Sequence, residues 1–166
     1  LLEQPTAGLY CRLDNFYIDP WQPVENAIIT HGHSDHARRG NKRYLAARGN
    51  ENILKARLGE DINLQIIAYG ECLSINGLQI SLHPAGHLLG SAQVRLEHNG
   101  QVWVVSGDYK VEPDGTCAPF EQLRCHTFVS ESTFGLPVFK WRAQSEIFGD
   151  MNTWWRENRD RGKTSL

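Results

Sequence analysis

The chain has 166 residues, of which 40% are hydrophobic and 22% are charged, and its formal net charge at pH 7 is −2. This length suits one ordinary domain with a buried core. The slightly negative charge argues against a protein that holds nucleic acid through overall basicity, so any such contact requires a local basic patch. No apolar run is long enough to span a bilayer, which predicts a soluble protein.

The cysteines and the two ends of the chain predict its compartment and its completeness. The four cysteines show no C-x-x-C spacing, and the first residues lack the basic and apolar segments of a signal peptide. We therefore expect free thiols and a cytoplasmic protein without membrane contact. Because there is no initiator Met, and residues 162–166 run from turn-like residues into an apolar one, we expect a piece of a longer protein.

The first predicted strands place a carboxylate at a strand end. Residues 8–19 read as two short strands joined by a turn at Asp14 and Asn15, which leaves Asp19 at the end of the second strand. Taken alone, Asp19 is better explained as a turn-capping carboxylate. Its position one strand before a His-rich segment instead indicates a carboxylate that accepts the N–H of a ligating histidine and fixes its tautomer.

The segment from Thr30 to His36 concentrates three imidazoles and one carboxylate within six positions, directly after the apolar run 27–29. That run reads as a buried strand. Neutral imidazole nitrogens and carboxylate oxygens are donors that Zn²⁺ accepts, and a strand end holds them at fixed geometry. The alternative is a His-rich surface loop. We favour a metal site that includes His31, His33, Asp35 and His36.

A local excess of positive charge follows. Residues 37–48 contain five basic side chains and no acidic one. Such a run is commonly a solvated face. Beside a metal site, however, it would also attract and align a phosphodiester backbone. Both interpretations stay open from the sequence alone.

The middle of the chain reads as one short helix followed by strands. Residues 50–59 place apolar side chains at helical spacing and end in Gly59. Residues 64–68 read as a strand. Two β-hairpins are predicted over residues 71–83 and 91–106, each with an Asn-Gly turn.

His87 lies between the two predicted hairpins, in a loop with one proline and two glycines that expose it. A single histidine is more often structural than ligating. Because His87 follows a strand, as the first cluster does, we favour a metal ligand. The other histidines lack this context and are interpreted as structural: His83, His98 and His126.

Two later strands also deliver carboxylates at their ends. The apolar run 102–105 leads through Gly107 to Asp108, and the run 126–130 leads to Glu131. Strand ends that converge on one edge form the active sites of layered α and β folds.

The last segment, 144–161, reads as a helix whose apolar face contains Trp154 and Trp155, which we expect to lie in a core.

These motifs resemble a known family. The pattern His-x-His-x-Asp-His over 31–36, the loop around His87 and the segment 106–108 resemble successive motifs of the metallo-β-lactamase fold, with Asp19 in the place of its first motif. Residues 131–135 resemble the first motif of the nuclease branch, whose members carry an inserted β-CASP domain and cut DNA or RNA. Residues 16–21, 105–110 and 133–137 are similar to one bacterial group, the ligase-associated DNA exonucleases, which are related to mRNA 3′-end processing nucleases.

The resemblance implies an α/β protein, an αββα sandwich with a site for two Zn²⁺ ions, or for Mn²⁺. One metal would be held by His31, His33 and His87, the other by Asp35 and His36, and Asp108 would bridge them. Catalytic roles are implied for Asp35, Asp108 and Glu131, the last near His36 or on the leaving-group side. The domain boundaries that follow are 1–135 for the metallo-β-lactamase-like part and 136–166 for the start of a β-CASP region.

The leading interpretation is a metal-dependent DNA exonuclease in DNA repair, with DNA ligase and helicase as partners by family analogy. An RNA-processing β-CASP nuclease is the alternative within the family. A small-molecule hydrolase of the glyoxalase or lactamase type is a second class, but it requires neither the motif at 131–135 nor a basic rim. A non-catalytic module is a third class, and it would not require an open ligand set.

Overall fold

The computed structural model describes residues 1–113 and 115–165. The chain divides into two compact units, Leu1–Glu131 and Ser132–Leu166. The domain division expected after residue 135 stays a prediction, and the last residue of that expected region, 166, lies outside the described part.

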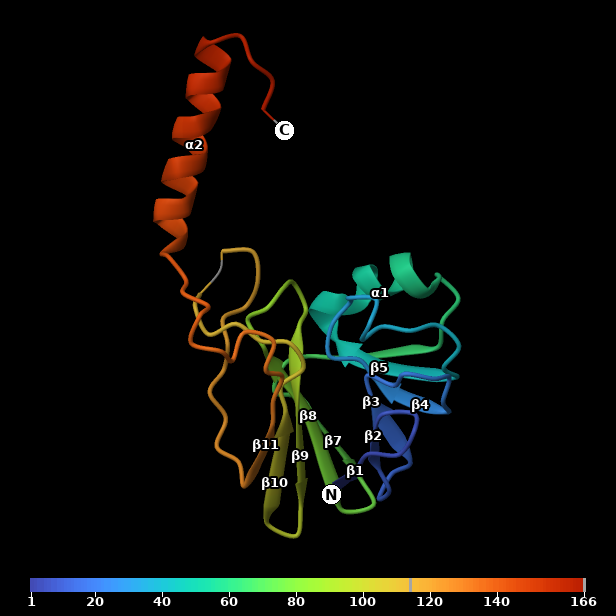
Figure 1. Ribbon diagram of the computed structural model, residues 1–166. Helices are drawn as coiled ribbons and strands as arrows, with labels where there is room; N and C mark the ends of the chain where they lie inside the picture. The colour runs from blue at the N-terminus through green and yellow to red at the C-terminus, as the bar shows by residue number, and fades with distance from the viewer. Residues whose placement is uncertain (114, 166) are drawn as a thin grey trace. The chain divides into compact units, whose positions relative to one another are not determined.

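The first sheet of the first unit has six strands in sequential order. They are β1 (Leu2–Glu3), β2 (Leu9–Cys11), β3 (Phe16–Ile18), β4 (Asn26–Ile28), β5 (Arg43–Ala47) and β6 (Leu64–Ile67). The first three pair antiparallel, and β3 to β6 run parallel. The residues that follow β3 and β4 therefore leave the sheet at the same edge (Figure 1). Residues 8–19 form the two strands that the sequence predicts.

The second sheet has five strands in the order β11-β10-β9-β8-β7. They are β7 (Cys72–Ile75), β8 (Leu78–Pro84), β9 (Ala92–His98), β10 (Gln101–Val105) and β11 (Thr127–Val129). Both predicted hairpins are present, and both residues of each Asn-Gly turn have positive φ, as a tight two-residue turn requires. Because β11 runs parallel to β10, Asp108 and Glu131 both follow strands of the same direction.

The main core lies between the two sheets. It combines side chains of the first sheet, such as Ile18 and Ile28, with side chains of the second, such as Leu82 and Leu96. Helix α1 (Glu51–Leu58), which follows the 3-10 turn η1 (Arg48–Asn50), packs Leu54 in a second cluster with β4 and β5. Helix α1 and the two sheets thus stack as layers (Figure 1), which confirms the predicted α/β class and αββα architecture in this part of the fold.

The second unit contains the helix α2 (Gln144–Asp160), which buries none of its residues. Trp154 and Trp155 are 49% and 57% exposed. The helix lies where the sequence predicts it, but the expectation that these two tryptophans lie in a core is wrong. Within the described residues of this unit, no second helix or strand covers the apolar face of α2. An amphipathic pattern predicts the helix but not the presence of a partner for its face.

Two further expectations concern the whole chain. All four cysteines are free: Cys11, Cys72, Cys117 and Cys125. Within the described residues, no helix has both the length and the apolar character that a membrane crossing demands.

Candidate metal centre

The candidate site forms where strands of both sheets end. The first ligand segment, His31 to His36, follows β4 of the first sheet. His87 lies in the loop between β8 and β9, and Asp108 follows β10, so these two come from the second sheet. The backbone N–H of Ala92 donates to the carbonyl oxygen of Thr30 at 2.8 Å, which joins the two sheets beside the site.

Three imidazoles and one carboxylate converge there, with one donor atom from each lying within 4.8 Å of all the others. The separations are 3.0 Å from His31 Nε2 to His33 Nδ1, 3.3 Å from His33 Nδ1 to His87 Nε2, and 3.5 and 3.6 Å from Asp108 Oδ2 to His31 Nε2 and His87 Nε2. A tetrahedral zinc with bonds of about 2.0–2.1 Å separates its ligands by roughly 3.3–3.4 Å. These four separations are close to those around one tetrahedral metal ion.

The second oxygen of the same carboxylate faces another pair of donors. Asp108 Oδ1 lies 3.3 Å from His36 Nε2, and His36 Nε2 lies 3.6 Å from Asp35 Oδ2. The side chain of Asp35 is 72% exposed, which leaves this second group open to solvent. The structure thus brings together all six residues that the sequence analysis named as ligands, with Asp108 between two groups of donors.

Asp19 and Thr30 orient two of the histidines. Asp19 Oδ2 lies 2.8 Å from His36 Nδ1 and accepts a hydrogen bond from the Thr30 hydroxyl at 2.6 Å, while Asp19 Oδ1 accepts from the Thr30 amide at 2.8 Å. The Thr30 hydroxyl lies 3.0 Å from His31 Nδ1. Because its single hydrogen goes to Asp19, it accepts the hydrogen of His31 Nδ1. Both His31 and His36 then carry hydrogen on Nδ1 and direct a lone pair of Nε2 into the site.

The surroundings keep the deeper imidazoles neutral. Burial, together with the neighbouring imidazoles, lowers the pKa of His31 to about 2. Burial also lowers the pKa of His87. For His36, burial acts in the same direction, but the hydrogen bond to Asp19 and the charges of Asp19, Asp108 and Asp35 outweigh it and raise the pKa. Neutral imidazoles are the form that binds a metal ion.

Two glycines let the ligand segments approach each other closely. A Cβ atom on Gly107 would lie 2.6 Å from Thr30 Oγ1, so glycine gives room between Asp108 and the Asp19–Thr30 pair. Gly90, at φ 77°, would place a Cβ 2.3 Å from the Asn50 backbone nitrogen. The His87 loop therefore packs directly against the turn before α1, at a distance that only glycine permits.

Glu131, the remaining predicted site residue, lies beside the carboxylate bridge. Its Oε1 accepts a hydrogen bond from the Tyr109 amide at 3.1 Å, one residue after Asp108. Its negative charge also acts on His87. The expected placement of Glu131 near His36 or on the leaving-group side stays a prediction. Its catalytic role stays a prediction.

The sequence analysis missed several supporting residues. Besides Thr30, Ser91 Oγ accepts hydrogen bonds at 3.2 Å from the amides of His87 and Leu88 and so shapes the His87 loop. The Tyr69 hydroxyl donates to the Ser91 carbonyl at 2.8 Å. Adjacency to His31 could have identified Thr30, and the small polar residue that closes a Gly-flanked loop could have identified Ser91. Tyr69 is distant in sequence and gives no such signal.

The histidines interpreted as structural make hydrogen bonds to other groups. His83 lies 3.0 Å from both Ser81 Oγ and Glu121 Oε2, on the strand β8. His98 Nδ1 lies 3.0 Å from the Gly77 carbonyl, and His126 Nδ1 accepts from the Val102 amide at 3.0 Å. These contacts account for them without a metal ion.

Comparison with known proteins finds relatives in several organisms. No family model matches the sequence. A probable DNA ligase from Opitutus terrae is 28% identical over 153 residues, which cover 90% of this chain and 15% of the ligase. Endoribonuclease YSH1 from Saccharomyces cerevisiae is 29% identical over 50% of this chain and 11% of its own length. A ribonuclease from Thermus thermophilus is 30% identical over 72% of this chain and 34% of its own length.

The chain thus spans about a third or less of the length of these relatives. Nucleases recur among the names of the relatives. The motifs and the paired sheets fit the resemblance to the metallo-β-lactamase-fold β-CASP nucleases, and the names of these relatives support that resemblance.

Proposed function

We propose that the protein is a metal-dependent nuclease that hydrolyses phosphodiester bonds, and that this chain supplies its metal-binding part. One observation carries the proposal. Donor atoms of His31, His33, His87 and Asp108 converge on one point, and the other oxygen of the Asp108 carboxylate faces a second group of donors. A small-molecule hydrolase could use a similar ligand set, but the nuclease names among the relatives favour a nucleic acid substrate.

His31, His33, His87 and Asp108 Oδ2 would hold one metal ion, and His36, Asp35 and Asp108 Oδ1 would hold the other. We propose zinc, because imidazole nitrogens and carboxylate oxygens at this spacing suit its tetrahedral preference, and Mn²⁺ is the alternative. When bound, two such cations supply a nucleophile from water at neutral pH and stabilise the charge on the attacked phosphate.

The protein side chains have separate roles in this proposal. Asp108 sets the distance between the two donor groups, because each of its oxygens faces one of them. Asp19 and Thr30 hold His31 and His36 in the ligating tautomer. Asp35 completes the exposed group, on the side open to substrate. Glu131 handles a proton on the leaving-group side.

We propose DNA as the substrate and an exonuclease acting in repair as the biological role, with a cytoplasmic location. The relative that matches 90% of this chain carries the name of a DNA ligase, which supports DNA and a ligase partner, and a helicase partner rests on family analogy. RNA is the second candidate, supported by the relatives named as ribonucleases.

The test is metal content together with cleavage of labelled strands by the full-length protein. We expect about two metal ions per chain and chelator-sensitive shortening of single-stranded DNA from one end. RNA of the same sequence, a β-lactam and a thioester serve as competing substrates. Faster cleavage of RNA would replace DNA as the substrate, and hydrolysis of the small molecules alone would contradict the nuclease proposal.

A further inference from the structure

We propose that an open depression next to the metal centre binds one strand of the nucleic acid substrate outside the cleavage site. The depression has a volume of about 630 Å³, and its lining includes Trp21, Pro23, Ser34, Arg38, Arg39 and Arg57. We call it the arginine depression. The inference rests on the proposed nuclease function, since it assigns a binding surface to the substrate of the same site.

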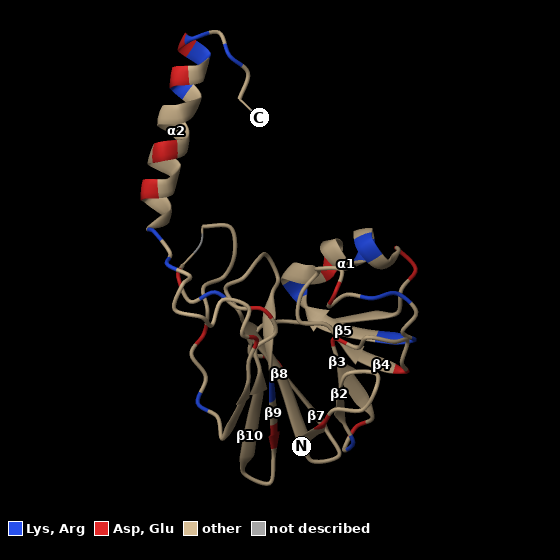
Figure 2. Cartoon of the chain, in the orientation of Figure 1, with Lys and Arg blue, Asp and Glu red and all other residues tan. Residues whose placement is uncertain are grey.

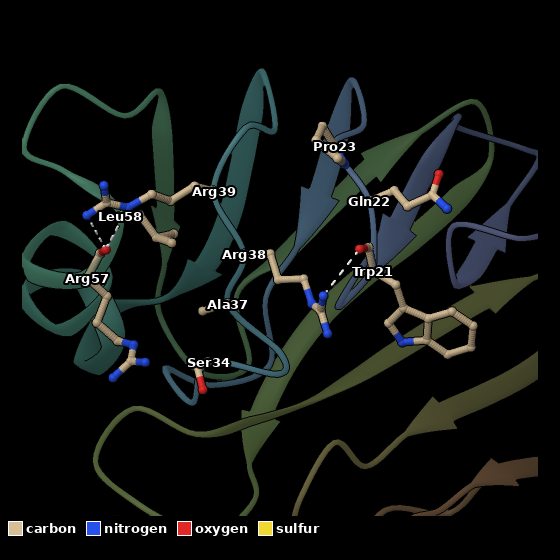
Figure 3. Close-up of a pocket in the computed structure, with 9 residues that line it drawn as sticks. All are labelled: Trp21, Gln22, Pro23, Ser34, Ala37, Arg38, Arg39, Arg57 and Leu58. Atoms are coloured by element: carbon tan, nitrogen blue, oxygen red, sulfur yellow. Dashed lines mark hydrogen bonds between the residues drawn. The ribbon is translucent and has the colours of Figure 1, made fainter.

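The arginine depression shares its wall with the metal-binding loop. Ser34 stands between the predicted ligands His33 and Asp35, and Ala37, which also lines the depression, directly follows His36. Trp21 comes two residues after Asp19. A strand lying in the depression would therefore be held by the reverse side of the loop that carries the ligands. Figure 3 shows Ser34 and Ala37 between Arg39 with Arg57 on one side and Arg38 with Trp21 on the other.

Three arginines bring positive charge to this surface. Arg39 donates from Nε and Nη2 to the Arg57 carbonyl oxygen at 3.1 and 2.9 Å. Arg38 donates to the carbonyl oxygens of Asp35 and Trp21, both at 3.4 Å. These acceptors are neutral, so they fix the guanidinium groups without neutralising them. Figure 2 shows Lys and Arg along the loop that leads into β5 and at the end of α1.

Neighbouring basic residues differ in this respect. Lys42 forms a 2.7 Å salt bridge with Glu25, and Lys55 forms one of the same length with Glu51. Within the described part of the chain, no salt bridge joins Arg38, Arg39 or Arg57 to a carboxylate. The charges of these three arginines beside the depression are therefore not offset by a paired carboxylate. A guanidinium has five N–H donors and matches phosphate oxygens in pairs, so Arg39, with two nitrogens already oriented, retains donors for a phosphate.

Trp21 supplies a surface for a base. Its backbone is fixed on both sides, because its N–H donates to the Ala7 carbonyl at 2.8 Å and its own carbonyl accepts from Arg38. Its side chain nevertheless remains 50% exposed. An exposed indole next to arginines without a paired carboxylate is the combination with which proteins hold single strands, by stacking on bases and by attraction of phosphates. An acidic peptide would use the arginines but not the indole.

The experiment measures binding of fluorescent single-stranded oligothymidine to the full-length protein by anisotropy, with chelator present so that nothing is cleaved. We expect Arg39→Gln and Arg57→Gln each to weaken binding roughly fivefold and to lower the slope of log K against log salt by about 0.7 per phosphate contact. Arg124→Gln is the matched control, since Arg124 is an exposed arginine before β11, away from the depression.

A second variant tests the indole. Trp21→Leu is expected to weaken binding of oligothymidine roughly tenfold, but to leave unchanged the binding of an abasic strand of equal length, which keeps the phosphates and lacks the bases. Equal loss for both strands would overturn the stacking role. Unchanged affinity of both arginine variants, or no strand binding by the unmodified protein, would overturn the arginine depression as a binding surface.

The same proteins are then assayed for cleavage with metal. If the unmodified protein cleaves strands while the three depression variants bind and cleave as it does, the nuclease function stands and the further inference falls. If the unmodified protein binds strands through the arginines and Trp21 but cleaves none, the binding surface stands and the nuclease function falls. The two proposals are thus distinguished.

Discussion

At the scale of single residues, the Asp108 carboxylate matters most. Its two oxygens face different donor groups, at 3.6 Å from His87 Nε2 and at 3.3 Å from His36 Nε2. No other described side chain has ion-pair contacts with three of the site histidines. Removal of this one carboxylate therefore affects both candidate metal positions at once.

We expect Asp108→Ala to lower metal-dependent cleavage by more than about a hundredfold, because loss of partners one step further from a metal already costs about 10–100-fold. Metal content is expected to fall as well, while the circular dichroism spectrum stays unchanged, since Asp108 is not part of either hydrophobic cluster. Glu25→Ala, which removes a surface carboxylate paired only with Lys42, is the control. Full activity of the Asp108 variant would remove the assigned site.

Thr30 gives a subtler test, since it binds no metal in the proposed arrangement. Its hydroxyl connects Asp19 to His31 at 2.6 and 3.0 Å and is 1% exposed. Thr30→Val retains the shape but removes the acceptor for His31 Nδ1–H, so we expect metal affinity to fall about 10–100-fold. Thr30→Ser keeps the hydroxyl and is expected to retain most of the affinity. Competition with a zinc-binding dye measures both, and equal affinities would contradict the tautomer argument.

The residue types of the site could be predicted from the sequence, but its supports could not. His31, His33, Asp35 and His36 stand together after an apolar strand, and strand ends restrict where such side chains can lie. The hydrogen bond from the Thr30 hydroxyl to Asp19 requires the pairing of β3 with β4, which no local sequence pattern predicts. Likewise, the closeness of Gly90 to Asn50 follows from packing of the His87 loop against the turn before α1.

At the scale of elements, the loop that carries His87 depends on its approach to the turn before α1. We expect Gly90→Ala to destabilise the protein by about 3 kcal/mol or more, because its Cβ would overlap the backbone of Gly49 and Asn50 at 2.3 Å. Gly100→Ala is the matched control, since Gly100 has a similar φ of 75° but no neighbour within 4 Å. It is expected to cost about 1 kcal/mol for backbone strain alone. Urea unfolding measures both, and equal costs would contradict the close-packing argument.

Tyr69 links the same loop to alkaline stability. Burial raises the pKa of Tyr69 to about 12, above its ordinary value of 10.0. The unfolded chain therefore releases this proton at lower pH than the folded chain, so the free energy of unfolding falls as pH rises from about 10 towards 12. Tyr69→Phe removes this contribution, and we expect its stability to fall less steeply over that range. Urea midpoints at pH 9 and pH 11 measure the difference, and parallel declines would contradict it.

The elements themselves were largely predictable, and the exception is instructive. Asn-Gly pairs between runs of alternating apolar residues predict the two hairpins, because a two-residue turn requires positive φ, which Asn and Gly adopt readily. The helix α2 also forms at its predicted position. The exposure of Trp154 and Trp155 was not predictable. An apolar stripe indicates which side of a helix can be buried, but not whether the same chain provides a surface that buries it.

At the scale of the whole molecule, the candidate metal positions join the two sheets. His31, His33 and His36 follow the first sheet, whereas His87 and Asp108 follow the second, and 50 residues or more separate the two sets along the chain. A ligand that binds only the folded state stabilises it by RT ln(1 + [L]/Kd). An ion bound by residues of both sets would therefore also hold the two sheets together.

We expect removal of metal by a chelator to lower the melting temperature of the protein by about 5–10 °C, which corresponds to about 2.7 kcal/mol for a metal present at 100 times its Kd. Re-addition of zinc is expected to restore it. In Asp108→Ala, which loses one oxygen from each donor group, chelator is expected to shift the melting temperature much less. An equal shift in both proteins would place the stabilising metal elsewhere. No shift in the unmodified protein would mean that the two sheets are held by their shared core of Ile28, Leu82 and Leu96 alone.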